Sequence, residues 1–255
     1  MPYPCVCTLH SICISGDYCL IQLTPILGPM MLQTISYQDL EDFSGLPVIR
    51  EILARRDPGF TINGIPKLVE QDKVDALQNT RIQKHQLATS SSPALGTIAQ
   101  VMESLHALSH TVFKNLSHGV ELPWEKYLGE MHEFAAPGKD ELRVFPWGES
   151  IANEWSTLTI VVNSSSPQEA LVLFGTALSV FTEGITPESA GSKINDDLLP
   201  SAPNDGKSYW LVYYVRPNQD VMYTRTAGAL MTPLSTQEYD SRERVKDLAE
   251  IDRVI

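Results

Sequence analysis

The sequence lacks the short motifs that mark the common catalytic sites. It contains no G-x-S-x-G, no H-E-x-x-H, no P-loop and no G-x-G-x-x-G following a strand. No His-x-Asp pair is present to suggest a facial-triad iron site. These absences lower the expectation of an enzyme without removing it, because catalytic groups can be assembled from residues far apart in sequence.

Basic residues are also scarce. The 255 residues include 19 Lys and Arg against 31 Asp and Glu, which gives a formal charge of −12. This balance argues against broad nucleic-acid binding, since such binding draws on Lys and Arg contacts to phosphates. The first basic residue is Arg50, and the apolar run at 18–31 is interrupted by Pro and Gly. We therefore expect a soluble, cytoplasmic protein with no secretory signal and no membrane span.

The cysteines occur at one end of the chain only. They are Cys5, Cys7, Cys13 and Cys19. β-Forming residues on both sides of a Ser-Gly-Asp turn predict an N-terminal β-hairpin at 1–30, which need not be tightly attached to a single domain at 31–255. Buried free thiols are the favoured interpretation of the cysteines. A Cys13–Cys19 disulfide and a zinc site that includes His10 are the alternatives.

Helical patterns dominate the middle of the chain, residues 37–136. A Ser- and Pro-rich stretch at 88–94 indicates a boundary within it. The segment that follows has apolar residues at i, i+3, i+4 and i+7 from Ile98 to Leu116, which predicts an amphipathic helix. A second helix is expected at 124–136, packed against the first.

One group of polar residues on the amphipathic helix resembles half of a di-iron carboxylate pattern. Glu103, His106 and His110 are spaced i, i+3 and i+7. At 100° per residue they fall opposite the apolar stripe, whereas ligands of such a centre face the interior. We therefore expect a solvated face and predict no metal site.

The best-specified part of the sequence lies between 158 and 224. The apolar runs at 158–162 and 209–215 predict buried strands. The Ser-Pro-Gln-Glu capping box at 166–169 and the apolar residues after it predict a helix at 170–181. Residues 221–224 are expected to pair with 209–215 as a hairpin.

These elements predict an α+β fold. The helical middle at 37–136 packs on a small C-terminal sheet built from 142–224 in the order strand, helix, strand, strand. The N-terminal hairpin at 1–30 is expected to extend this sheet.

Two functions remain open at this point. The favoured one is a non-catalytic scaffold, assembly or interaction protein without cofactors, which meets a protein partner or a second copy through the charged C-terminal helix that starts at Ser235. The alternative is a small-molecule-binding protein or enzyme with an aromatic-lined pocket under a lid at 184–207. The residues expected to line that pocket are Phe145, Trp147, Trp155, Trp210 and Tyr214.

Overall fold

The computed structural model describes residues 32–68, 81–87, 93–122, 127–146, 156–164, 166–182, 184–186, 209–219, 221–223 and 234–235. All of them belong to the compact unit Leu32–Ile255. The predicted hairpin at 1–30, with its four cysteines, and most of the predicted C-terminal helix lie outside the described residues. Among the described residues, no helix is long and apolar enough to cross a membrane.

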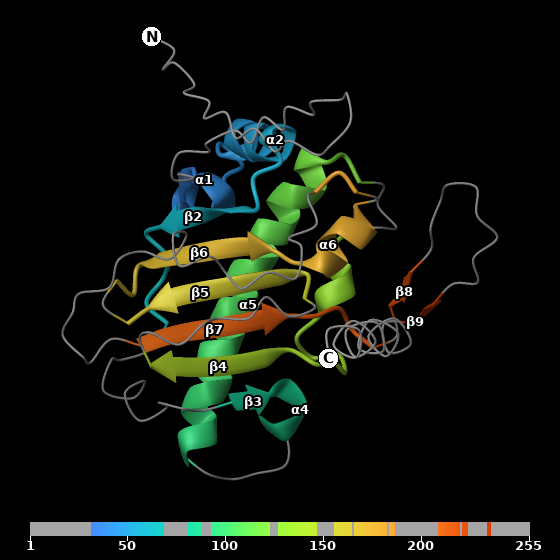
Figure 1. Cartoon of the computed structure of the whole chain (residues 1–255). Helices are drawn as coiled ribbons and strands as arrows, with labels where there is room; N and C mark the ends of the chain where they lie inside the picture. The colour runs from blue at the N-terminus through green and yellow to red at the C-terminus, as the bar shows by residue number, and fades with distance from the viewer. Residues whose placement is uncertain are drawn as a thin grey trace, which may run out of the picture. The chain divides into compact units, whose positions relative to one another are not determined.

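A seven-stranded mixed sheet forms the centre of the unit (Figure 1). Across the sheet the strands are β1 (Thr34–Ser36), β2 (Gly59–Asn63), β6 (Glu169–Phe174), β5 (Leu158–Asn163), β7 (Tyr209–Val215), β4 (Glu141–Pro146) and β3 (Arg81–Gln83). β1 and β2 are parallel, and every other neighbouring pair is antiparallel.

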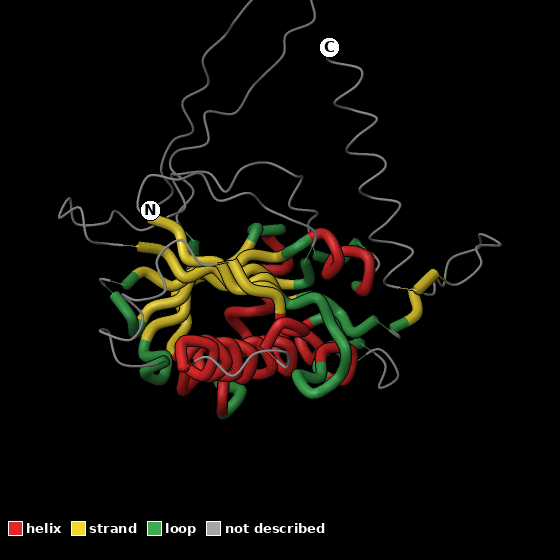
Figure 2. Tube along the Cα trace, turned by 90° about the horizontal axis from the view of Figure 1, so that it is seen from below, coloured by secondary structure: helices red, strands yellow, loops and turns green. Residues whose placement is uncertain are grey.

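Helix α5 (Pro93–Gly119) packs across one face of this sheet (Figure 2). Its predicted apolar stripe is confirmed, because every member is almost inaccessible to solvent: Ile98, Val101, Met102, Leu105, Leu108, Val112, Phe113 and Leu116. The shorter helices are α1 (Tyr37–Glu41), α2 (Leu46–Arg55), α4 (Lys84–Leu87), α6 (Thr176–Phe181) and the 3-10 turn η2 (Glu130–His132). A separate two-stranded ribbon joins β8 (Met222–Tyr223) to β9 (Leu234–Ser235).

The predicted architecture of a helical middle on a small C-terminal sheet is wrong. Strands β1, β2 and β3 come from the first 83 residues and extend the sheet at both edges. Each has only three to five residues, too few for an alternating pattern to stand out from the surrounding helical pattern. The second helix expected at 124–136 is reduced, within the described residues, to the single turn η2.

The helix predicted at 170–181 is also wrong in its first half. Residues Glu169–Phe174 form strand β6, and only Thr176–Phe181 is helical. A continuous apolar run fits a strand that is buried on both faces as well as it fits a buried helix, so periodicity could not separate them. The supposed capping box closes the β5–β6 hairpin instead, with the Glu169 amide donating to the Ser166 carbonyl at 3.0 Å.

The strands predicted at 158–162 and 209–215 are confirmed as β5 and β7. They are central neighbours and pair in antiparallel register, with Val161 opposite Val212. The hairpin partner expected at 221–224 is wrong, because β7 pairs with β4 and β5 while Met222–Tyr223 pairs with Leu234–Ser235. Both long apolar runs therefore fill the centre of the sheet.

Candidate functional site

The two faces of the sheet differ in chemistry. Because side chains alternate along a strand, one set points toward α5 and joins the main hydrophobic core. The other set forms what we call the second face. Its members on the four central strands are Glu141, Arg143, Phe145, Trp210, Val212, Tyr214, Thr159, Val161, Asn163, Leu171 and Leu173. Among the described residues, this face combines buried aromatic rings with buried guanidinium and carboxylate groups.

Three of the five aromatic residues predicted to line a pocket lie on the second face. Phe145 on β4 is directly opposite Trp210 on β7, and Tyr214 lies four residues further along β7 on the same face. Trp210 and Tyr214 are buried, whereas Phe145 is half-buried and packs against the same apolar cluster. Trp147 and Trp155 lie outside the described residues, as does the predicted lid beyond residue 186.

A buried carboxylate forms the polar centre of the second face. Glu141 accepts from Arg81 Nε at 2.5 Å, from Arg216 Nη1 at 3.3 Å and, at short range, from Arg143 Nε. Burial alone would raise the pKa of Glu141, but the hydrogen bonds from Arg143 and Arg81 outweigh it and lower the pKa to about 2. The carboxylate is therefore ionised at neutral pH and well below it.

Two of these guanidinium groups also contact the ring of Tyr214. The central carbon of Arg143 lies 4.9 Å from the ring centroid, and that of Arg216 lies 5.7 Å away. A guanidinium held by a carboxylate and by an aromatic face has a fixed orientation. In the sequence, Glu141 and Arg143 are two residues apart, a spacing that places both on one face of a strand. This spacing indicated a charged cluster, and it was not used to predict one.

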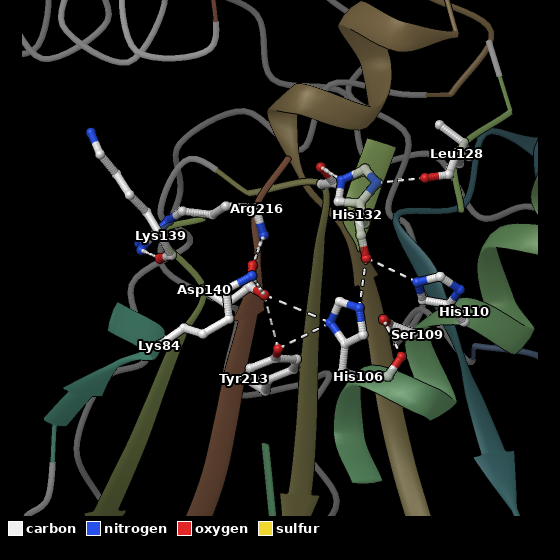
Figure 3. A network of polar contacts seen from close by, with 11 residues as sticks. Lys84, His106, Ser109, His110, Leu128, His132, Lys139, Asp140, Tyr213 and Arg216 are labelled. Atoms are coloured by element: carbon white, nitrogen blue, oxygen red, sulfur yellow. Dashed lines mark hydrogen bonds and ion pairs between the residues drawn. The ribbon is translucent and has the colours of Figure 1, made fainter. Parts of the chain in front are cut away.

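A second polar network lies beneath the sheet, on the side of α5 (Figure 3). Asp140, just before β4, accepts from the Tyr213 hydroxyl at 3.1 Å and from the Arg216 backbone amide at 2.8 Å. Its carboxylate is 3.4 Å from Lys84 Nζ and 3.6 Å from His106 Nδ1. Asp140, Tyr213 and His106 are all buried, so this network fastens α4 and α5 to the sheet.

The solvated face predicted for Glu103, His106 and His110 is wrong for His106, which is only 5% exposed. Its Nε2 lies 2.6 Å from the His132 carbonyl oxygen, and His110 Nε2 lies 2.9 Å from the same oxygen. The segment around η2 covers this side of α5, so the helix is buried on more than its apolar stripe. Glu103 is exposed, as predicted.

Burial keeps the two histidines of this network neutral. It lowers the pKa of His132 to about 3 and that of His106 to about 4, although Asp140 acts in the opposite direction on His106. His132 Nδ1 donates to the Leu128 carbonyl at 2.6 Å, which leaves Nε2 to accept from the Thr157 hydroxyl at 2.7 Å. Both nitrogens of His132 are thus occupied by hydrogen bonds.

These depressed pKa values predict a pH-dependent stability. The unfolded chain takes up protons on both imidazoles below about pH 6.5, whereas the folded protein does not until about pH 4 at His106 and pH 3 at His132. Stability is therefore complete above about pH 7 and falls as the pH decreases, by about 1.4 kcal/mol per pH unit for each imidazole. Urea unfolding between about pH 5 and pH 7 measures this slope, which the variant His106→Gln should reduce by about half. A free energy of unfolding that does not change over this interval would contradict the neutral, buried state of both rings.

Comparison with known proteins identifies the fold. No protein-family model matches the chain, and no curated protein matches its sequence. Solved structures do match it. A putative 2OG-Fe(II) oxygenase family protein from Caulobacter crescentus has a TM-score of 0.60 at 10% identity, over 85% of this chain and 99% of that one. A full-length Neurospora crassa protein, solved in complex with alpha-KG, has a TM-score of 0.60 at 12% identity, over 83% and 95%. The rice dioxygenase for auxin oxidation has a TM-score of 0.53 at 10% identity, over 85% and 95%.

These similarities establish an oxygenase-type fold for residues that span nearly the whole length of each matched structure. They overturn the favoured interpretation of the sequence as a non-catalytic scaffold, assembly or interaction protein, together with the oligomeric character expected of it. The Caulobacter protein is described as a member of an oxygenase family and the rice protein as a dioxygenase.

Proposed function

We propose that this chain is a small-molecule-binding protein or enzyme built on the oxygenase fold, with its ligand on the second face of the sheet. The observation that carries the proposal is the convergence of Phe145, Trp210 and Tyr214 on the face that also holds the Glu141 cluster. Ligand sites combine apolar and aromatic walls with a few fixed polar groups, and this face has both.

The ligands of the matched structures indicate the class of molecule to try first. The Neurospora crassa protein was solved with alpha-KG, and in separate structures with thymine or 5-formyluracil as well. The rice enzyme is a dioxygenase for auxin oxidation. α-Ketoglutarate, thymine and an auxin are therefore suitable probes for the second face.

The residues that the structure describes do not fit the iron centre that the matched fold implies. Non-haem Fe(II) oxygenases hold their metal with two histidines and a carboxylate. All six histidines of this chain occur at or before His132, so strands β4 to β7 carry none. The described residues contain no group of three or more His, Cys, Asp or Glu side chains that could hold a metal. The nitrogens of His106 and His132 are already engaged in hydrogen bonds.

We expect Phe145→Ala to weaken binding of the ligand about tenfold or more, because the half-buried ring is more accessible to solvent than Trp210 or Tyr214. Isothermal titration with the three probes measures the effect. Phe43→Ala is the matched control, since Phe43 is exposed and its ring contacts His118 of α5, the helix that covers the opposite face of the sheet. Equal affinities in the two variants, or binding of no probe by the native protein, would count against the proposal.

Three further expectations are part of this proposal. The lid at 184–207 would cover the bound ligand, and deleting it should change the affinity. The chain would act in the cytoplasm, which cell fractionation tests. The segment after Ser235, which the sequence predicts as a helix, would provide any contact with a protein partner, and loss of partner binding in a chain truncated at this position tests that.

A further inference from the structure

A short irregular segment beneath the sheet, residues 127–137, is attached to its surroundings in an unusual way. We call it the strap. Throughout its described length it contains the turn η2 and no strand, so no ladder of backbone hydrogen bonds joins it to the sheet. The Asn218 and Gln219 amides donate to its Met131 and Pro137 carbonyls at 2.9 and 3.1 Å. Most of the side-chain hydrogen bonds that join it to α5 and β5 involve imidazole rings.

Two imidazoles of α5 meet one backbone oxygen of the strap (Figure 3). The carbonyl oxygen of His132 accepts from His106 Nε2 at 2.6 Å and from His110 Nε2 at 2.9 Å. The ring of His132 stacks on Phe113 of α5, with 4.3 Å between the centroids, and its Nε2 lies 2.7 Å from the Thr157 hydroxyl. The three histidines therefore join the strap to α5 and to the start of β5.

The surroundings of His132 do not favour a second proton on its ring. The side chain is fully buried, and among the described residues no carboxylate forms an ion pair with it. The cationic or titratable groups that face it are the two imidazoles of α5 and the ammonium of Lys84, and all of them act against protonation. The ring of Phe181 closes another side. A charge at this position would be buried without compensation, which is costly.

The surroundings of His106 oppose a proton less strongly. Its Nδ1 lies 3.2 Å from the Tyr213 hydroxyl and 3.6 Å from the Asp140 carboxylate, so a charged ring has a polar partner there. Lys84 pairs with the same carboxylate at 3.4 Å and competes for it. The ring of Phe134, from the strap, covers His106 at 5.1 Å between the centroids. Opening the strap would therefore bring both His106 and His132 into water.

We infer that the strap is an acid-sensitive latch, which opens as His132 and His106 take up protons while the central sheet stays folded. In the open strap both rings take up protons below about pH 6.5, their ordinary range, whereas the closed strap admits them only near pH 3 and pH 4. The closed state is therefore fully favoured above about pH 7. As the pH falls, the opening constant rises by up to about tenfold per pH unit for each ring. Opening uncovers the ring of Phe113 on α5.

Native-state hydrogen exchange of the full chain between pH 5 and pH 7, at several urea concentrations below the unfolding transition, tests the latch. The amides of His132, Ala136 and Asn218 report on the strap, and the amide of Val212 on central strand β7 reports on the sheet. We expect the strap amides to lose protection by about 50-fold between pH 6 and pH 5, after correction for intrinsic exchange. Their exchange should depend little on urea and that of Val212 steeply, because a local opening exposes little surface.

Glutamine replaces each ring by a side chain that does not titrate in this range. His132→Gln and His106→Gln should each reduce the loss of protection between pH 6 and pH 5 from about 50-fold to about sevenfold. His106→Gln leaves the contacts of the His132 ring in place, so it carries the test if His132→Gln does not fold. His118→Gln, at an exposed position of the same helix, should leave the loss unchanged.

Three results would overturn the inference. Strap amides and the Val212 amide that share one protection and one urea dependence would show that the strap opens only when the whole protein unfolds. An opening constant that is the same at pH 5 and pH 7 would show that protons do not drive it. A pH dependence that neither glutamine variant reduces would assign the effect to other groups.

Discussion

Replacing Asp140 with alanine is expected to lower the free energy of unfolding by about 3–5 kcal/mol. The carboxylate accepts hydrogen bonds from the Tyr213 hydroxyl and the Arg216 amide and pairs with Lys84, which is only 9% exposed. Its removal would leave a buried ammonium facing no carboxylate among the described residues. Chemical denaturation followed by circular dichroism measures the loss.

Glu51→Ala provides the control for this experiment. Its ion pair with Arg55 is exposed, with 59% and 48% of the two side chains accessible to solvent. Surface pairs of this kind contribute roughly 0.5 kcal/mol or less. If Asp140→Ala costs no more than Glu51→Ala, the network beneath the sheet does not fasten α4 and α5 to it.

The second large effect is expected at Gly175, between β6 and α6. A β-carbon at this position would overlap the Ser156 carbonyl oxygen, which also accepts the Ala177 amide at 3.0 Å. Backbone atoms on both sides must shift to admit it, so Gly175→Ala should destabilise the protein by about 3 kcal/mol. Thermal and urea unfolding of the variant measure this cost.

Gly96→Ala is the matched substitution with the opposite expected sign. Gly96 lies in α5, and a β-carbon there meets no other atom within 4 Å. Alanine in a helix is favoured over glycine by about 0.5–1 kcal/mol, so this variant should be more stable than the native chain. Equal effects of the two substitutions would show that the close approach at Gly175 is not maintained in solution.

The sequence was sufficient where one pattern persists over many residues. The stripe from Ile98 to Leu116 identified α5, because five turns of regular spacing fit no strand. The continuous apolar runs identified β5 and β7 as central strands. In each case one pattern was enough to predict whether the segment is a helix or a strand.

The rest depended on contacts between distant segments. β3 becomes a strand by pairing with β4, about 60 residues away, and its three residues have no distinctive pattern of their own. His106 is buried because the segment with His132 covers it, and nothing within α5 indicates that. Local spacing cannot reveal a neighbour supplied by another part of the chain.

Only part of the candidate site could be predicted, because the rest also depends on contacts between distant segments. The aromatic residues Phe145, Trp210 and Tyr214 were proposed together from composition, and strand pairing brings them onto one face. The charged residues were missed, because Glu141 and Arg143 form a cluster only through contacts with Arg81 and Arg216, which come from other parts of the chain. Clusters of this kind are a product of tertiary structure.

The most direct test of a ligand site on the second face is a crystal structure of the protein grown with α-ketoglutarate and EDTA. The account predicts the ligand on this face, beside the aromatic rings of Phe145, Trp210 and Tyr214. A ligand bound on the α5 side of the sheet, or coordinated to a metal ion elsewhere in the chain, would contradict it.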